Sequence, residues 1–460
     1  NYSPICISET TDLKDIKIEQ LVLAYNYTMA LDNEGNVWLW GNKESILKDV
    51  VNGVQTFPTK IDSSYFGSSK IKIIDGGYTN AIVVDEFGKV WTWGSSDLLG
   101  TQSITSTSTP ICISDEETEA LYGKQIDLLA INDYSSRNII ATDKNSCLWT
   151  WGYDDSIVYR TYEQTKNPKL ISYAYNEHLE YNVKFKSVEV YNNKVYAIDE
   201  EGQLWVWGSQ SSYYELGLGN YSNYYMTPIK LELPGNPKIK KVISAGGYGA
   251  IALSEDGRIY SWGYLYDMYD SSITDIIERT DEFNLDDNTI IIDVDTYRAD
   301  SLWAIDSEGK VYKCLNNTIE CISDDDSEIL KGVNIVKLDV DVNGNATAID
   351  DKGEIYHWNA YSYGTGPKKY ESNLDVKFVD VLGGYLLDDT GKLWTFRNND
   401  ELICRSDRVY NPFDNSEMDL YKDVKKQEAK KEAKKEIKME VKEDVKNKSS
   451  KKTKKETTLT

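Results

Sequence analysis

The most regular feature of this chain is a short strand with apolar residues on both of its faces. Residues 32–41 read DNEGNVWLWG, an acidic turn followed by four apolar residues and a glycine. Side chains alternate between two faces along a strand, so Val37 and Leu39 lie on one face and Trp38 and Trp40 on the other. A strand with one face in water would alternate apolar with polar residues. The pattern therefore predicts a strand that is buried on both sides and is entered through a tight glycine turn.

The same phrase recurs along the chain. Seven further copies begin at Asp85, Asp143, Asp199, Ser254, Asp306, Asp350 and Asp388. The first aromatic residues of successive copies are 38 to 58 residues apart. A repeat of about 50 residues built from strand signals is typical of a propeller or a similar array. Each unit has four strand signals separated by glycines, so we predict an all-β fold, a β-propeller of seven or eight four-stranded blades, with eight repeat units counted.

Segments of two neighbouring repeat units resemble the repeat of the regulator of chromosome condensation family. One unit contributes VISAGG at 242–247, AIAL at 250–253 and GRIYSWG at 257–263. The unit before it contributes ELGLG at 215–219 and Thr227-Pro228. The resemblance extends from about Ile18 to Arg408 and implies a β-propeller, which in this family usually has seven blades. It also implies the family's best-known activity, guanine-nucleotide exchange on a small GTPase. The consensus histidine of the family is replaced by Thr79-Asn80 in one unit and by Tyr248-Gly249 in another.

The beginning of the chain resembles the last strand of a repeat unit. PICIS at 4–8 matches PICIS at 110–114. This segment either closes the ring against the final blade or belongs to a truncated upstream repeat. The chain begins with Asn1 and not with Met, so we expect that it lacks its natural N-terminus.

Charge divides the chain into two parts. The formal net charge is −24, yet residues 417–460 hold 15 Lys and 10 Asp or Glu, which leaves about −29 on the rest. We therefore predict a propeller domain at 1–412 and a tail at 413–460 that is part helix and part disordered. A body this acidic repels phosphate backbones, so direct nucleic-acid binding by the body is not expected, and a basic protein partner fits better.

The sequence offers little to a catalytic or metal-binding interpretation. The two histidines, His178 and His357, have no partner motif, and Cys314 and Cys321 lack the neighbours of a zinc site. We expect no catalytic residues, no cofactor and no metal, and hence no enzyme. No apolar run reaches the length of a membrane span. Equivalent cysteines in different repeats lie far apart, and unpaired thiols favour a cytoplasmic location, although a secreted one stays open.

Two sets of residues are candidates for partner binding. The first is a tyrosine-rich loop, because tyrosine is common at adaptable binding surfaces. Its members are Tyr213, Tyr214, Tyr221, Tyr224 and Tyr225. The second is the set of acidic turns, which a propeller would carry on one face and which would then attract a cationic surface. Its representatives are Glu200, Glu201, Asp350 and Asp351.

We therefore predict a monomeric propeller without chemistry of its own, which binds a protein, of basic character, through an acidic face and tyrosine-rich loops. The first alternative is a guanine-nucleotide exchange factor, which would distort a partner's nucleotide site and needs no catalytic triad. The second alternative is a secreted propeller that acts as an inhibitor or adhesin.

Overall fold

The computed structural model describes residues 4–7, 12–24, 27–41, 55–77, 80–95, 97–101, 103–104, 106–117, 119–132, 138–152, 165–171, 183–191, 193–219, 224–245, 248–265, 275–286, 288–296, 302–315, 318–323, 329–340, 345–359, 366–370, 376–382 and 384–396. All of them belong to one compact unit. The predicted tail lies outside the described residues, as do Tyr221 and His178, so the boundary at residue 412 stays a prediction.

Eight four-stranded antiparallel sheets make up this unit, and the predicted β-propeller is confirmed with eight blades. Blade 1 contains β2 (Ile18–Leu23), β3 (Tyr27–Asp32), β4 (Val37–Gly41) and β5 (Gln55–Lys60). Blade 2 contains β6 (Ile71–Gly76), β7 (Asn80–Asp85), β8 (Val90–Ser95) and β9 (Ser106–Cys112). Blade 3 contains β10 (Ile126–Asn132), β11 (Asn138–Asp143), β12 (Leu148–Gly152) and β13 (Thr165–Leu170). Blade 4 contains β14 (Phe185–Tyr191), β15 (Lys194–Asp199), β16 (Leu204–Ser209) and β17 (Tyr224–Lys230).

The second half of the chain continues the same order of strands. Blade 5 contains β18 (Ile239–Ala245), β19 (Gly249–Ser254), β20 (Ile259–Gly263) and β21 (Ile277–Glu278). Blade 6 contains β22 (Ile291–Asp295), β23 (Leu302–Asp306), β24 (Val311–Leu315) and β25 (Thr318–Cys321). Blade 7 contains β26 (Ile335–Val340), β27 (Asn345–Asp350), β28 (Ile355–Asn359) and β29 (Lys368–Lys369). Short 3-10 helices lie between strands at η1 (Ser63–Phe66), η2 (Asp97–Leu99) and η6 (Thr280–Phe283).

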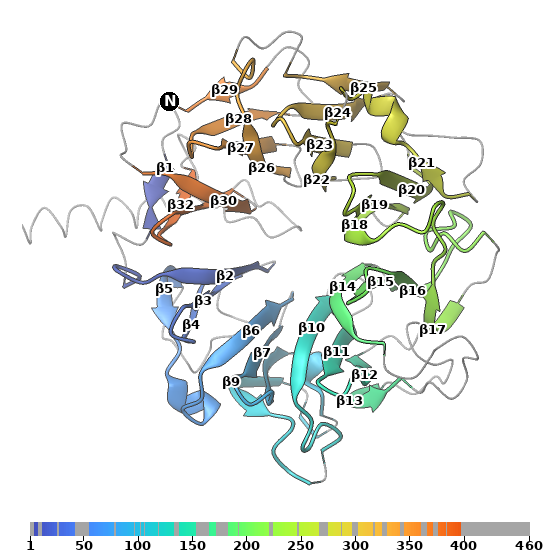
Figure 1. The fold of residues 1–460 in the computed structure, drawn as a ribbon. Helices are drawn as coiled ribbons and strands as arrows, with labels where there is room; N and C mark the ends of the chain where they lie inside the picture. The colour runs from blue at the N-terminus through green and yellow to red at the C-terminus, as the bar shows by residue number, and fades with distance from the viewer. Residues whose placement is uncertain are drawn as a thin grey trace, which may run out of the picture. The chain divides into compact units, whose positions relative to one another are not determined.

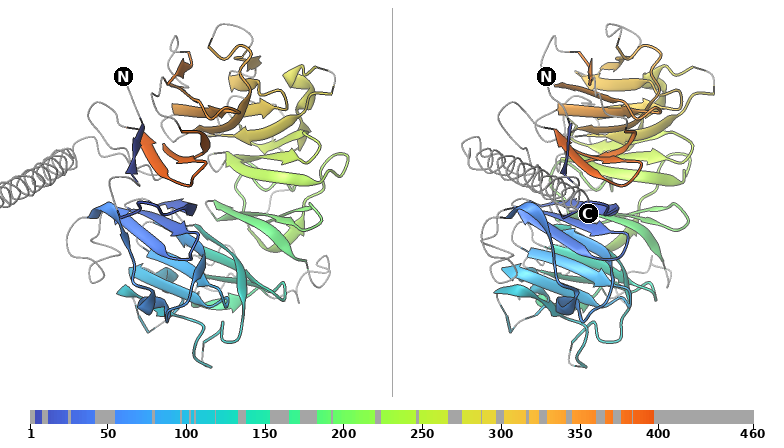
Figure 2. Two further views of the ribbon diagram at one scale, coloured as in Figure 1. Left: turned by 60° about the vertical axis from the view of Figure 1, so that its left-hand side comes forward. Right: turned by 90° about the vertical axis from the view of Figure 1, so that its left-hand side faces the viewer.

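The N-terminal strand completes the last blade. Blade 8 contains β30 (Phe378–Leu382), β31 (Tyr385–Asp388), β32 (Leu393–Phe396) and, from the start of the chain, β1 (Pro4–Cys6). β1 pairs antiparallel with β32, and Ile5 lies opposite Thr395. Of the two roles that the sequence left open for this segment, the structure shows ring closure. In Figure 1 the first strand of each blade lies toward the centre of the ring, and Figure 2 shows the blades in succession from the side.

A hydrophobic cluster fills every joint between neighbouring blades. Val37 and Leu39 of β4 belong to the cluster between blades 1 and 2, whereas Trp38 and Trp40 belong to the cluster between blades 8 and 1. The prediction that this strand is buried on both faces is therefore confirmed. The second cluster also contains Tyr385 of β31, so the last blade packs against the first.

In six of the eight blades, the turn between the second and third strands also forms a backbone hydrogen bond with the next blade. Gly35 has φ +85°, and its carbonyl accepts a hydrogen bond of 2.9 Å from the N–H of Ile71, the first residue of β6. A Cβ at Gly35 would lie 2.7 Å from the Cβ of Lys70. Glycine is required there for both its conformation and its size. Gly391 makes the equivalent bond to Ile18 across the closing joint, at 3.1 Å.

The first strand of each blade, which we call the inner strand, has a β-bulge near its start in all eight blades. The register between first and second strands shifts after the first residue of each inner strand, for example between Ile71 and Ile73 of β6. A bulge leaves one residue unpaired and increases the local twist of its strand. The eight bulges therefore lie at the same end of the blades as the turns.

Candidate functional site

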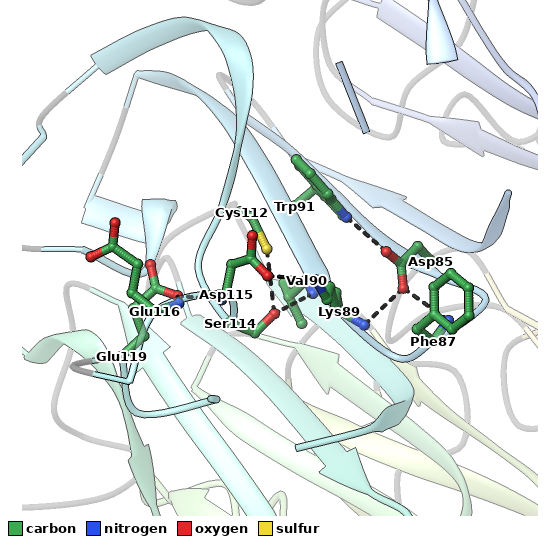
Figure 3. A network of polar contacts seen from close by, with 10 residues as sticks. All are labelled: Asp85, Phe87, Lys89, Val90, Trp91, Cys112, Ser114, Asp115, Glu116 and Glu119. Carbon is green, nitrogen blue, oxygen red and sulfur yellow. Dashed lines mark hydrogen bonds and ion pairs between the residues drawn. The ribbon is translucent and has the colours of Figure 1, made fainter. Parts of the chain in front are cut away.

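Aspartate opens the turn between the second and third strands in seven of the eight blades. In blade 2, Oδ1 of Asp85 accepts hydrogen bonds from the backbone N–H groups of Phe87 and Lys89, both at 2.9 Å (Figure 3). Oδ2 accepts the indole N–H of Trp91 at 3.1 Å. The same three bonds recur with a tryptophan or tyrosine at Asp32, Asp143, Asp199, Asp306, Asp350 and Asp388. All seven aspartates are buried, so their carboxylates serve the turn and not the surface.

The exposed charges around these turns have both signs. We call this end of the blades the turn face and define it by residues 32–37, 85–90, 143–148, 199–204, 254–259, 306–311, 350–355 and 388–393. Its exposed acids are Glu34, Glu200, Glu201, Glu255, Asp256, Glu308, Asp351 and Asp389. A lysine precedes the inner strand beside the turns of five blades, at Lys17, Lys70, Lys184, Lys238 and Lys377. The carbonyls of these lysines accept N–H groups from the adjacent turns.

Among the predicted acidic residues, the structure separates one from the other three. Asp350 is 3% exposed, and its oxygens bind the turn and the hydroxyl of Tyr356. Glu200, Glu201 and Asp351 are exposed, and Glu200 forms an ion pair of 2.7 Å with Lys184. An ion pair between exposed groups contributes little to stability but reduces the local field. A binding role for the three exposed residues stays a prediction.

The tyrosine-rich loop forms an aromatic patch at the other end of the blades. Tyr213, in the loop between β16 and β17, packs edge-on against Tyr248 with ring centroids 5.3 Å apart. Tyr213 also packs against Tyr264, at 5.4 Å. The three residues, which we call the tyrosine patch, come from three connections in blades 4 and 5. Tyr213 and Tyr248 are 38% and 47% exposed, so the rings touch one another and still face solvent.

A buried glutamate holds the loop that presents the patch. The carboxylate of Glu215 accepts the backbone N–H of Ser211 at 2.8 Å and lies 3.6 Å from the amino group of Lys194. Its backbone carbonyl accepts the Tyr196 hydroxyl at 2.7 Å and the Trp262 indole N–H at 2.8 Å. Burial lowers the pKa of Lys194, and Glu215 opposes that change. These bonds reach blades 4 and 5, so the loop is fixed from both sides before any partner binds.

The other predicted tyrosines surround the same end of blade 4. Tyr224 lies opposite Ser209 at the start of β17 and is exposed, whereas Tyr225 is half-buried against the cluster between blades 4 and 5. Tyr214 is half-buried and has φ +55°, in the left-handed region. The structure therefore brings the described tyrosines of the loop to one end of the blade.

The two predicted sets of residues do not form one surface. Glu200 and Glu201 precede β16, whereas Tyr213 follows it. A strand of six residues spans about 20 Å at about 3.3 Å per residue. A small partner contact therefore covers the tyrosine patch or the turn face, but not both.

Sequence reasoning missed two parts of this end of the molecule. The sequence marks Tyr248 only as part of the replacement of the family's consensus histidine. Its contact with Tyr213 depends on the packing of blade 5 against blade 4. In blade 2, the loop at Leu98 and Gly100 matches the one at Glu215, because the Leu98 carbonyl accepts the Trp151 indole N–H at 3.0 Å. In both loops a leucine-glycine pair follows the third strand of the blade, which carries the repeated tryptophans. This pair is the sequence signal that could have identified the loops.

The part of the chain that the structure describes holds no group of three or more His, Cys, Asp or Glu side chains placed to bind a metal ion. Among the same residues, no helix is long and apolar enough to cross a membrane. His357 is half-buried on β28, where its Nδ1 lies 3.1 Å from the hydroxyl of Thr347. Partial burial lowers the pKa of His357, and its contacts with Thr347 and Tyr370 are those of a packed histidine.

Residues 201–253 match the family model of the regulator of chromosome condensation (RCC1) repeat. The Ultraviolet-B receptor UVR8 of Arabidopsis thaliana is 24% identical over 258 residues, which cover 55% of this chain and 54% of that protein. The guanine nucleotide exchange factor SRM1 of Saccharomyces cerevisiae is 24% identical over 267 residues, 54% of this chain and 53% of that protein. The matched region spans about half the length of these curated relatives.

A solved structure gives the same result for the fold. Human WBSCR16 aligns with a TM-score of 0.52 at 16% identity, over 83% of this chain and 86% of that one. The chain therefore forms an eight-bladed β-propeller that contains a regulator of chromosome condensation (RCC1) repeat at residues 201–253 and is similar, at low identity, to proteins of that repeat family.

Proposed function

We propose that this propeller is a non-catalytic module that binds a protein partner through the tyrosine patch. The observation that carries the proposal is the contact of Tyr213 with Tyr248 and Tyr264, in which three rings from separate connections meet and keep solvent-exposed area. Tyrosine adds large contact area with little loss of side-chain entropy, and it is common among the residues that dominate binding energy.

The anchoring of the loop supports this proposal. Binding is stronger when the contact residues are already ordered, because less conformational entropy is lost on association. Glu215 fixes the loop through Ser211, Lys194 and Trp262, so Tyr213 is held in place before binding. The chemistry of an enzyme has no comparable support among the described residues.

The test is affinity capture from the native source with matched variants, followed by quantitative mass spectrometry. Tyr213→Ala combined with Tyr248→Ala is expected to lose most of the enrichment of the true partner, on the order of tenfold or more. Phe87→Ala, which removes an exposed aromatic side chain on the turn face, is the control and is expected to retain it. If the tyrosine variant stays folded and captures the same proteins in the same amounts, the proposal fails.

A second proposal concerns the acidic face predicted from the sequence. We infer that Glu200, Glu201 and Asp351 steer a basic partner, since long-range attraction acts mainly on the association rate. Reversal of all three to lysine is expected to slow association, most strongly at low salt. Asp350 is left unchanged because it is buried in its turn. The lysines nearby limit the expected effect, and equal rates from 20 to 300 mM salt would disprove steering.

Guanine-nucleotide exchange on a small GTPase is the alternative function. Its support is the relationship to SRM1, which is a guanine nucleotide exchange factor. An exchange factor of this kind would speed nucleotide release from a GTPase of the same organism. Release assays with a panel of such GTPases separate this function from simple binding, because a binding module leaves the release rate unchanged.

A further inference from the structure

The loop that presents Tyr213 is a longer form of a loop in blade 2. Leu98 and Glu215 hold equivalent places, because the backbone carbonyl of each accepts the indole N–H of a tryptophan in the next blade. Three residues separate Leu98 from Gly94, near the end of the third strand, whereas six separate Glu215 from Gly208. Tyr213 lies in the longer segment. The blade 2 loop makes the same bond without the extra residues, so these are not required to pack one blade against the next.

The rings of the tyrosine patch keep open faces. Tyr213 and Tyr248 meet at an interplanar angle of 85°, and an edge-to-face contact of this kind covers one face of one ring only. Tyr264 is half-buried and packs against Tyr213 at 44°. The face of an aromatic ring carries the negative part of its quadrupole, which attracts a cation. The exposed rings of Tyr213 and Tyr248 therefore offer surfaces on which a cationic group can lie.

Elsewhere in the propeller, cations of the chain itself cover aromatic rings. Three such pairs have the cationic group within 6 Å of the ring centroid, the range in which the attraction is effective. They are Lys313 over Trp303 at 5.4 Å, Lys124 over Trp149 at 5.7 Å and Arg258 over Tyr260 at 5.9 Å. Among the residues that the structure describes, no lysine or arginine lies in this way over Tyr213 or Tyr248. A cation on these two rings would therefore come from another molecule.

The charge near the patch is negative. In the described parts of blades 4 and 5, the exposed lysines lie at or next to the start of the inner strands, at the turn-face end, and are Lys184, Lys186, Lys238 and Lys240. At the opposite end, the exposed charged residues in the same parts of the chain are Glu189 and Asp275, and Lys194 is buried beside Glu215.

Asp275 lies close to the patch. Ser261 of β20 pairs with Ile277 of β21, and continuing this register places Asp275 beside Gly263, the residue before Tyr264. A cationic group that approaches the patch therefore meets a carboxylate and no exposed base among the described residues. This arrangement is complementary to positive charge.

We propose that the tyrosine patch binds arginine side chains of a protein partner, with the guanidinium group on the ring face of Tyr213 or Tyr248 and near Asp275. The inference rests on the proposed binding role of the patch and specifies the chemistry of the partner. A guanidinium group is planar, stacks on aromatic rings and is more weakly hydrated than an ammonium group. Arginine therefore fits exposed tyrosine rings beside a carboxylate better than lysine does.

The first measurement compares two synthetic peptides of equal length. One carries several arginines separated by glycine and serine, and the other has citrulline, which has a similar shape and no charge, at each arginine position. Binding is followed by fluorescence anisotropy at about 150 mM salt, where long-range attraction to the acidic body is screened. The arginine peptide is expected to bind the wild type more tightly than the citrulline peptide, on the order of fivefold or more. Tyr213→Leu combined with Tyr248→Leu, which keeps apolar side chains but removes the rings, is expected to abolish this difference.

The second measurement changes the electrons of one ring and not its size. Tyr248 is replaced by phenylalanine in one variant and by trifluorophenylalanine in another, because fluorine withdraws electron density from the ring face. The phenylalanine variant is expected to bind the arginine peptide within about twofold of the wild type, and the trifluorophenylalanine variant about threefold or more weakly than the phenylalanine variant. The same pair of rings at position 87, on the turn face, is the control and is expected to show no difference.

Three results would overturn the assignment of arginine. They are equal binding of the two peptides, no measurable binding of the arginine peptide, and equal binding by the phenylalanine and trifluorophenylalanine variants at position 248. The proposed function would survive each of them, because it depends on whether capture of the native partner is lost on Tyr213→Ala and Tyr248→Ala. The two failures are therefore distinguishable.

Discussion

The carboxylate of Asp199 accepts more hydrogen bonds than closure of its turn requires. Its oxygens accept the N–H groups of Glu201 and Gln203 and the indole N–H of Trp205. Removal of the carboxylate leaves three buried or half-buried donors unpaired, and each such donor costs about 1–3 kcal/mol. The repeated aspartate of this chain is therefore a structural residue first.

Asp199→Ala is expected to lower the free energy of unfolding by about 3 kcal/mol or more. Urea unfolding at pH 7 measures the change. Glu201→Gln, two residues away and exposed, is the matched control and should change stability by less than about 0.5 kcal/mol. Equal stability of the alanine variant and the wild type would mean that the aspartate is dispensable for the turn.

The sequence predicted the turn glycines and the tryptophan pattern, but not the burial of the aspartates. Alternation along Val37–Gly41 is sufficient to assign two buried faces, because only local geometry is involved. The hydrogen bond that the Trp38 indole N–H donates to Asp32 depends on how the third strand folds back over its turn, which residue types alone do not specify. The acidic turns therefore suggested more surface charge than the structure has.

At the scale of elements, β1 is the strand whose loss is expected to lower the stability of the propeller most for its length. It supplies the outer strand of blade 8 from the opposite end of the described chain, through three paired positions with β32. Pairing of this kind joins the ends of the ring by hydrogen bonds in addition to the cluster around Trp40 and Tyr385.

Deletion of residues 1–7 is expected to lower the melting temperature by several degrees, because β32 loses its neighbour and becomes an exposed edge. Differential scanning calorimetry measures the shift. Deletion of residues 413–460 is the control. This longer segment is predicted from the sequence to lie outside the repeats, so its loss should leave the melting temperature unchanged. If both deletions behave alike, β1 does not close the ring in solution.

Strand order within each blade could be predicted from the sequence, whereas the joints between blades could not. Two hydrogen bonds between blades join residues that are far apart in the chain. The Ile71 N–H donates to the Gly35 carbonyl, and the Ile131 N–H donates to the Asp75 carboxylate. No local pattern marks such pairs, since each partner alone is an ordinary strand or turn residue. The same reason explains why Tyr248 was missed as a member of the patch.

At the scale of the whole molecule, charge separates the propeller from the predicted tail. The tail is rich in lysine, shares no repeat phrase and has no consistent apolar face. Brief trypsin digestion is expected to leave a stable core that ends between about Arg408 and Lys425. Mass spectrometry of the core identifies the end, and protection of Lys430–Lys446 would contradict a separable tail.

The whole molecule also presents two ends with different chemistry. The turn face mixes exposed acids with lysines, and the opposite end carries the tyrosine patch on a loop fixed by Glu215. The central functional claim is that the partner contacts the tyrosine patch. A photo-crosslinking amino acid at one position on each end distinguishes the two surfaces.

The most direct measurement places p-benzoylphenylalanine at Tyr248 in one variant and at Phe87 in another, both incubated with extract from the native source. Phe87 is 59% exposed on the turn face, so it is a matched aromatic control. We predict a specific crosslinked protein from position 248 and none from position 87. Crosslinking to the same protein from position 87 alone, or equally from both positions, would contradict the assignment of binding to the tyrosine patch.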